Sequence, residues 1–260
     1  MRALDRGTVH VWRLPLRPFI DASTREIGAS FDTSSSDAAP LSVLLRRLSP
    51  DERTRALRYY RVADRVRFAR ARGVLRALLA SHVDRDPSAI VFTQGAHGKP
   101  SAVQADEAGV AFNVSHSGDY ALIALTRGRE VGVDVEAHRE MSDAYDLADR
   151  FFSPPEAAAL RAWDLAGRDA AFFACWSRKE AFAKATGFGI GSILPKFQVS
   201  IDPAVIDVPL TIDASLDDGR AWTLRSLDVA DGYSAAVAVD GPPVPPDGWR
   251  VTDLPSTACI

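Results

Sequence analysis

Polar and apolar residues alternate over several short runs of the chain, and this period of two predicts β-strands. One run opens the chain, and three follow one another between residues 110 and 136 with short turns between them, which predicts an antiparallel meander. Four more runs occupy the last third of the chain. The predicted strands cover residues 9–14, 89–93, 110–115, 120–126, 131–136, 197–201, 210–213, 222–229 and 233–239.

A helical period of apolar residues marks two other stretches. The first begins at Ser49, where a capping serine, a proline and two acids form a typical helix start, and its apolar positions recur as far as Val83. Its arginines lie mostly on the opposite face, so we expect an amphipathic basic helix. The second stretch has a similar start at Ser153 and a further helix over residues 168–186 that ends at Gly187.

Helices followed by a small set of strands occur twice in this order of elements. The order predicts an α+β fold of two similar α+β halves, with helices packed on small antiparallel sheets. We place an N-terminal half at residues 1–137, a C-terminal half at 138–240 and an extended tail at 241–260, which begins with a proline-rich run. Because one chain supplies both halves, we expect a monomer.

Charge is spread unevenly along the 260 residues, although the net charge is only −3. Between Arg46 and Arg76 there are eleven arginines and three acids, an excess of eight positive charges that favours an acidic partner. Two cysteines, Cys175 and Cys259, are too few for a disulfide framework, and no run approaches 18 apolar residues. We therefore expect a cytoplasmic protein without a membrane segment.

Two carboxylates lie close together in the predicted strand over residues 131–136. Side chains alternate along a strand, so Asp134 and Glu136 share one face, about 7 Å apart, while the valines between them face the core. Their charges repel unless a cation lies between them, and Mg²⁺ prefers oxygen ligands of this kind. The alternative is an ordinary strand with a solvent-exposed polar face.

The helix over residues 168–186 places Glu180 and Lys184 one turn apart, on a stripe that includes Trp176. A carboxylate on such an aromatic surface could bind a metal, although a surface ion pair is the commoner meaning of this spacing. Residues 112–118, with His116 among them, end a strand with groups that can meet an anion, and Lys99 could pair with a phosphate. A solvated histidine and a solvated lysine are the alternatives.

Four motifs, in this order and at these spacings, resemble the signature motifs of the Sfp-type 4′-phosphopantetheinyl transferases. They are Gly98-Lys99-Pro100, residues 112–118, Gly132-Val133-Asp134-Val135-Glu136 and residues 176–189. The resemblance extends over residues 45–240, and its last two motifs together are very specific.

The resemblance implies transfer of phosphopantetheine from coenzyme A to a serine of an apo acyl or peptidyl carrier protein of fatty-acid, polyketide or nonribosomal-peptide synthesis, with release of 3′,5′-ADP. It implies a site at the interface of the two halves, where Mg²⁺ binds the coenzyme A pyrophosphate. The metal ligands would be Asp134, Glu136 and Glu180, with Glu180 and Lys184 as the catalytic residues. The residues that would contact coenzyme A are Lys99, Ser115, His116, Arg61, Arg67 and Lys179.

Two other functions remain open from the residues alone. Three carboxylates also suit a Mg²⁺-dependent phosphohydrolase, which would use water and need no carrier protein. The basic helix also suits a non-catalytic module that binds nucleic acid, but the acidic balance elsewhere and the absence of a nucleic-acid motif argue against it. We therefore expect neither a nucleic-acid partner nor a membrane partner.

Overall fold

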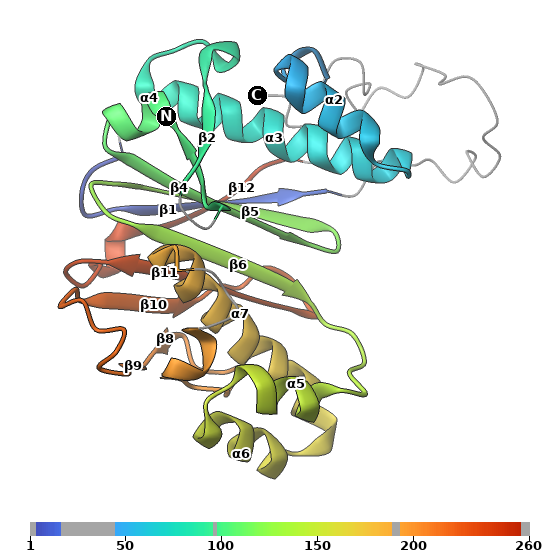
Figure 1. Ribbon diagram of the computed structural model, residues 1–260, viewed down its shortest axis with the longest axis vertical. Helices are drawn as coiled ribbons and strands as arrows, with labels where there is room; N and C mark the ends of the chain where they lie inside the picture. The colour runs from blue at the N-terminus through green and yellow to red at the C-terminus, as the bar shows by residue number, and fades with distance from the viewer. Residues whose placement is uncertain (1–3, 17–44, 96–97, 189–192, 256–260) are drawn as a thin grey trace.

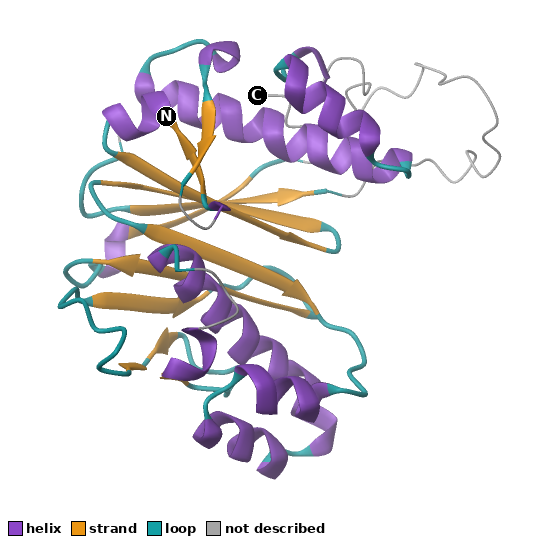
Figure 2. Cartoon of the chain, viewed as in Figure 1, coloured by secondary structure: helices purple, strands orange, loops and turns teal. Residues whose placement is uncertain are grey.

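The chain folds into two packed sheets whose outer faces are covered by helices (Figures 1 and 2). The computed structural model describes residues 4–16, 45–95, 98–188 and 193–255. The predicted α+β class, with helices on small sheets in each half, is confirmed. No helix in these ranges is long and apolar enough to cross a membrane. Cys175 is a buried free thiol, and Cys259 lies outside the described residues.

The first half consists of one four-stranded sheet, a short hairpin and a helix layer. The buried faces of α3 and α4 pack on one face of the sheet, and α2 packs on α3 (Figure 1). The sheet has the order β12-β1-β5-β4, in which β12 and β1 are parallel. The elements are β1 (Val9–Pro15), α2 (Pro50–Arg58), α3 (Val62–Val83), η1 (Pro87–Ala89), β2 (Phe92–Gln94), β3 (Pro100–Ala102), α4 (Val103–Glu107), β4 (Val110–Ser117), β5 (Tyr120–Arg127) and β12 (Trp249–Asp253).

The basic stretch forms two helices rather than one. A capping box between Ser49 and Glu52 begins α2, as predicted, but the backbone becomes extended after Arg58 and the chain turns before α3. Glu52 is buried and binds Arg76 at 2.8 Å and Arg72 at 3.4 Å. These two arginines therefore fasten α2 to α3 instead of contributing to a basic surface.

The second half repeats the plan with a sheet of order β6-β11-β10-β8 and a layer of α5, α6 and α7 on its outer face (Figure 1). The predicted caps are confirmed, because α6 begins with a capping box at Ser153 and α7 ends at a left-handed Gly187. The elements are β6 (Val131–Ala137), α5 (Ala144–Phe151), α6 (Pro154–Ala162), η3 (Leu165–Gly167), α7 (Arg168–Thr186), η4 (Leu194–Lys196), β7 (Phe197–Val199), β8 (Asp207–Val208), β9 (Leu210–Ile212), β10 (Trp222–Ser226), β11 (Tyr233–Asp240) and η5 (Pro246–Gly248).

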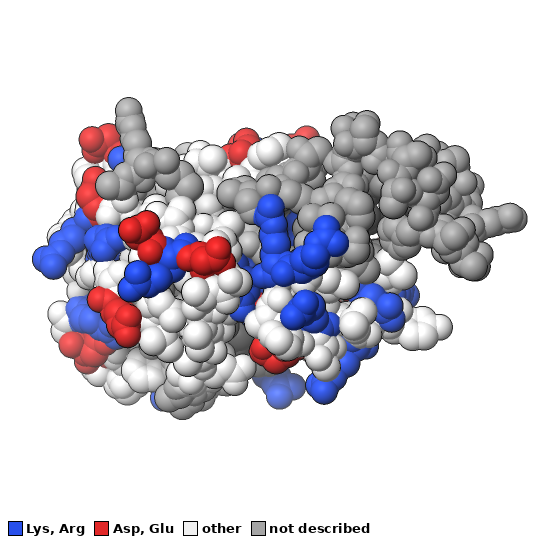
Figure 3. Space-filling model, turned by 90° about the horizontal axis from the view of Figure 1, so that it is seen from above, with Lys and Arg blue, Asp and Glu red and all other residues white. Residues whose placement is uncertain are grey.

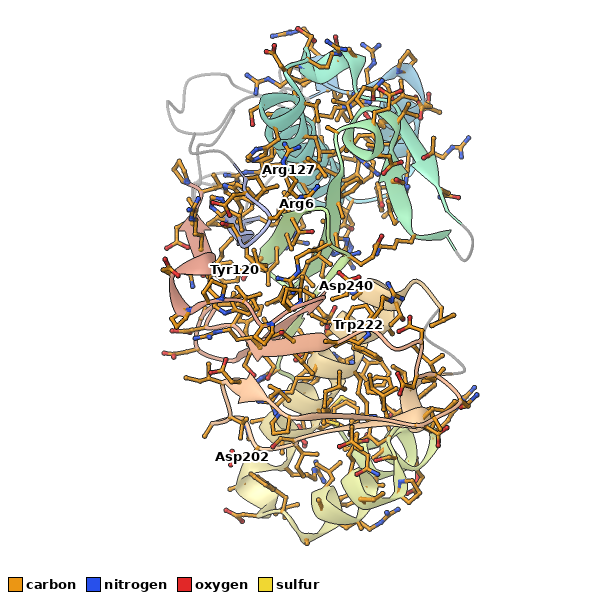
Figure 4. All side chains as sticks on the ribbon, turned by 90° about the vertical axis from the view of Figure 1, so that its left-hand side faces the viewer. Arg6, Tyr120, Arg127, Asp202, Trp222 and Asp240 are labelled. Atoms are coloured by element: carbon orange, nitrogen blue, oxygen red, sulfur yellow. The ribbon has the colours of Figure 1, made fainter. Side chains whose placement is uncertain are left out.

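A layer of valine, alanine and leucine side chains joins the two sheets. Figure 4 shows side chains filling this space, where Tyr120 of β5 meets Tyr233 of β11 edge to face with ring centroids 5.0 Å apart. Val131, Val133 and Val135 of β6 belong to this core, so the predicted division of the strand into two faces is confirmed. The halves are therefore joined by a continuous apolar core.

Strand pairing differs from the prediction in two places. The expected meander is wrong at its third strand, because β4 and β5 pair but β6 pairs with β11 in the other sheet. The segment 241–260 is not simply an extended tail, because β12 pairs with β1 in the first sheet. In both places the partner lies more than 90 residues away, which periodicity along the chain cannot indicate. The division into halves near residue 137 stays a prediction.

Candidate active site

Strands β4 and β6 lie side by side and are joined by side chains rather than by a backbone ladder. Three alternate side chains of β4, those of Asn113, Ser115 and Ser117, each offer an oxygen atom to a backbone amide of β6. The three bonds run from Val133 N to Asn113 Oδ1 at 3.0 Å, from Val135 N to Ser115 Oγ at 3.4 Å, and from Ala137 N to Ser117 Oγ at 3.0 Å. We call this row of three hydrogen bonds the seam. It joins strand β4 of the first half to strand β6 of the second half.

The same serines hold two of the predicted metal ligands. Ser115 Oγ donates to Asp134 Oδ1 at 2.7 Å, and Ser117 Oγ donates to Glu136 Oε2 at 3.1 Å. From α7, the Lys184 ammonium donates to Asp134 Oδ1 at 2.5 Å and to Ser115 Oγ at 3.2 Å. Three elements that are distant in sequence thus meet at Asp134, whose exposed fraction is only 1%.

Gly132 explains how α7 comes so close to β6. A β-carbon at this position would lie 2.1 Å from the Ala181 carbonyl oxygen and 2.3 Å from the Ala185 amide nitrogen. Only a glycine lets the helix backbone rest directly on the strand. Helix α7 thus covers the strand face that carries Asp134 and Glu136, so Asp134 is buried beneath α7 and not solvated.

Negative charge exceeds positive charge in this cluster. Glu180 lies 3.4 Å from the Lys184 ammonium and, like Glu136, is partly buried. Burial, together with the nearby Asp134 charge, raises the pKa of Glu136, and burial also raises the pKa of Glu180. Burial alone would lower the pKa of Lys184, but Asp134 and Glu180 hold it above the usual value. The Lys184 ammonium therefore pairs with two of the three carboxylates and acts on the third, Glu136, only through its charge.

The chemistry of these oxygen donors, rather than their present arrangement, suits a divalent cation. Asp134 Oδ2 is buried and has no hydrogen-bond partner, so it has an unused site for a cation. Three carboxylates and one ammonium leave two negative charges uncompensated, and hard oxygen ligands of this kind suit Mg²⁺. Among the described residues no three acids converge on a single point, because the Lys184 ammonium lies between Asp134 and Glu180.

Other predicted contact residues lie around this cluster. Lys99 donates to Glu130 Oε2 at 2.7 Å and to the Ala185 carbonyl at 3.0 Å, which places it beside the end of α7. His116 is exposed at the end of β4. Arg67 lies 3.7 Å from Asp119 in the turn that follows β4. Arg61 is exposed at the N-cap position just before α3, and among the described residues it forms no ion pair with the acids of the cluster.

Lys179 is not a ligand-binding residue in this structure, which corrects the prediction. Its side chain is fully buried in the second half, where the ammonium binds Glu156 at 2.7 Å and donates to the carbonyl oxygens of Leu194 and Phe197. Successive residues of a helix point about 100° apart. Glu180 therefore faces the acidic cluster while Lys179 faces the core.

Asn113 and Ser117 are site residues that the sequence reasoning did not single out. They form one face of β4 together with Ser115, and three polar residues at a spacing of two on an otherwise apolar strand were a usable signal. The pattern alone is equally typical of a strand with one solvated face. Its use as a seam depends on the position of β6.

Fold and site together define an enzyme of two α+β halves with an acidic cluster at their junction. Residues 130–238 match the family model described as "4′-phosphopantetheinyl transferase superfamily", and residues 34–127 match "4′-phosphopantetheinyl transferase, N-terminal". These two matches cover the two halves separately. Both the acidic cluster and the basic helices lie inside them.

Individual relatives agree with the family models. The chain is 35% identical over 245 residues to the 4′-phosphopantetheinyl transferase HetI of Nostoc sp., which covers 93% of this chain and 92% of that protein. It is 30% identical to a phosphopantetheinyl transferase of Thraustochytrium sp., over 78% of this chain and 75% of the relative. It is also 30% identical to the 4′-phosphopantetheinyl transferase Sfp of Bacillus subtilis, over 77% of this chain and 85% of Sfp. The chain belongs to the 4′-phosphopantetheinyl transferase family, as the motifs predicted.

Proposed function

We propose that this transferase moves phosphopantetheine from coenzyme A to a serine of an apo acyl or peptidyl carrier protein and releases 3′,5′-ADP. The observation that supports it best is the cluster of Asp134, Glu136 and Glu180 around Lys184 at the junction of the halves. This cluster offers ligands for a metal-complexed pyrophosphate and a lysine for the charge that develops on it. The family assignment gives no support to a phosphohydrolase or to a nucleic-acid-binding module.

In the proposed reaction the carrier serine oxygen forms a bond to the phosphorus that bears the pantetheine arm. The bond from that phosphorus to the oxygen of 3′,5′-ADP breaks, and the serine proton passes to a base, for which Glu180 is our candidate. Mg²⁺ held by Asp134, Glu136 and Glu180 would neutralise charge on the pyrophosphate. Lys184 keeps its proton beside two carboxylates, so its ammonium can stabilise the leaving phosphate.

Coenzyme A would lie along the seam and make contact with both halves. We assign its phosphates to Lys99, Ser115, His116 and Arg67, which surround the acidic cluster, and keep Arg61 as an outer candidate. The positive charges of Lys99 and Arg67 would offset the negative charge of the nucleotide, and Ser115 and His116 would offer hydrogen bonds. A cytoplasmic monomer remains our expectation for the working form.

One experiment tests this function directly. The protein is incubated with Mg²⁺, coenzyme A and an apo carrier protein, and the carrier is weighed by mass spectrometry for a phosphopantetheine adduct. Asp134→Ala should lower turnover by about 10²-fold, as expected for loss of a direct transition-state stabiliser. Glu107→Ala, which removes an exposed acid of α4, is the matched control and should change nothing. Cleavage of coenzyme A without an adduct would instead show a phosphohydrolase.

A further inference from the structure

Apolar side chains are exposed at the corner where α2 meets α3. All six residues from 57 to 62 are exposed, and we call this segment the α2–α3 corner. Its apolar members are Leu57, Tyr59, Tyr60 and Val62, with exposed fractions of 52%, 36%, 96% and 45%. Soluble proteins scatter single exposed apolar residues, but four within six positions form a patch that indicates an interaction site.

Arginines surround these apolar side chains. Arg58 and Arg61 lie within the corner and Arg53 lies about one helical turn before Leu57, and all three are exposed. Among the described residues, the arginines of α2 and α3 that form ion pairs are Arg67, Arg72 and Arg76, so the corner's own arginines are available to a partner. Figure 3 looks onto this helix layer and shows Lys and Arg with few Asp and Glu toward the end where α2 and α3 meet, whereas both kinds of charge are mixed toward the other end.

The corner is held in place before any partner binds. Arg65 Nε donates to the Tyr59 carbonyl at 2.8 Å, and the Tyr59 ring lies 5.6 Å from the Phe68 ring. Glu52 of α2 binds Arg72 and Arg76 of α3, and these ion pairs hold the two helices together. A surface that is already ordered loses little conformational entropy on binding, which favours affinity.

The corner also lies near the acidic cluster. Val62 and Arg67 are five residues apart on α3, about 7.5 Å along the helix axis. Arg67 reaches Asp119 at 3.7 Å, and two residues before Asp119 is Ser117, whose hydroxyl binds Glu136. A folded partner of about 100 residues has a radius of gyration of about 13 Å. Such a partner bound at the corner could therefore present a residue to the cluster.

We propose that the α2–α3 corner is the docking surface for the carrier protein, which would present acidic residues beside apolar ones. This inference rests on the proposed function. Tyrosine and arginine are the residue types most often found as binding hot spots, and exposed arginines select an acidic partner by charge. A nucleic acid would use the arginines but would leave Leu57 and Val62 exposed, which makes a protein the better fit.

The test is steady-state transfer with either the carrier or coenzyme A as the varied substrate. Tyr60→Ser should raise the KM for the carrier about 10-fold or more, as for a central hot spot, and leave the KM for coenzyme A unchanged. Arg58→Glu should raise the KM for the carrier and weaken its dependence on salt. Leu165→Ser is the matched control, because Leu165 is 70% exposed in the second half and its flanking arginines, Arg161 and Arg168, are paired with Asp149 and Asp169; it should behave like the unaltered protein.

The other possible outcomes distinguish the docking surface from the proposed transferase function. An unchanged KM for the carrier in Tyr60→Ser would overturn the docking surface while leaving the transferase function intact. An equal rise in both KM values would place the corner in the coenzyme A site and would also overturn it. Absence of any adduct with the unaltered protein would overturn both proposals together. The unchanged KM for coenzyme A also shows that the variant is folded.

Discussion

Replacing Gly132 by alanine tests whether α7 must rest directly on β6. The added β-carbon would meet the Ala181 oxygen at 2.1 Å and the Ala185 nitrogen at 2.3 Å, whereas ordinary contact begins near 3.4 Å. Both atoms belong to the helix backbone, so no side chain can turn away. The helix must therefore move by about 1.3 Å, the difference between 3.4 and 2.1 Å.

Two consequences follow from that displacement. Overpacking of this kind costs about 1–3 kcal/mol in the free energy of unfolding, which lowers the Tm by several degrees. Glu180 and Lys184 flank the contact on the same helix and would move away from Asp134. Because a misplacement of about 1 Å can cost about 10²-fold in rate, the loss of activity should exceed the loss expected from stability alone.

The assays are urea unfolding and single-turnover transfer, with Gly73→Ala as the matched control. Gly73 lies inside α3 and a β-carbon there meets nothing within 4 Å, so the same substitution should stabilise the protein by about 0.5–1 kcal/mol. Its activity should not change. If Gly132→Ala has the stability and the turnover of the unaltered protein, the close packing of α7 on β6 is not what positions the cluster.

Four further substitutions, at Glu180, Lys184, Lys179 and His10, should give distinct results. Glu180→Gln should weaken Mg²⁺ binding and transfer together, whereas Lys184→Ala should lower kcat and keep Mg²⁺ affinity, as Mg²⁺ titration in single-turnover transfer would show. Lys179→Met leaves Glu156 buried without its partner, so urea unfolding should show a loss of about 3–5 kcal/mol, with the KM for coenzyme A unchanged in the folded enzyme. Burial, with nearby positive charge, lowers the pKa of His10 from 6.5 to about 4 in the folded protein. As the pH falls, the unfolded chain therefore takes up this proton at a higher pH than the folded chain does. The free energy of unfolding should consequently decrease as the pH falls from 6.5 toward 4. The loss is below about 1.4 kcal/mol per pH unit because the ring is partly exposed, and His10→Gln should flatten the slope of unfolding free energy against pH.

Local features of this protein were determined by the sequence alone. The caps at Ser49 and Ser153, the end of α7 at Gly187 and the shared face of Asp134 and Glu136 all follow from contacts within a few residues of the chain. Rules of helix capping and strand alternation depend only on such neighbours. The motifs also indicated the family, which the matches over both halves confirm.

Tertiary structure decided the features that depend on residues far apart in the chain. Periodicity indicates a strand but not its partner, so only the fold shows β6 beside β11 and β12 beside β1. The same limit applies to adjacent charges on α7. Lys179 and Glu180 look equally available in the sequence, but Glu156 binds the first inside the core and Lys184 lies beside the second at the junction. Burial is set by which surface covers each helix face, and that surface comes from distant segments packed on either side of α7.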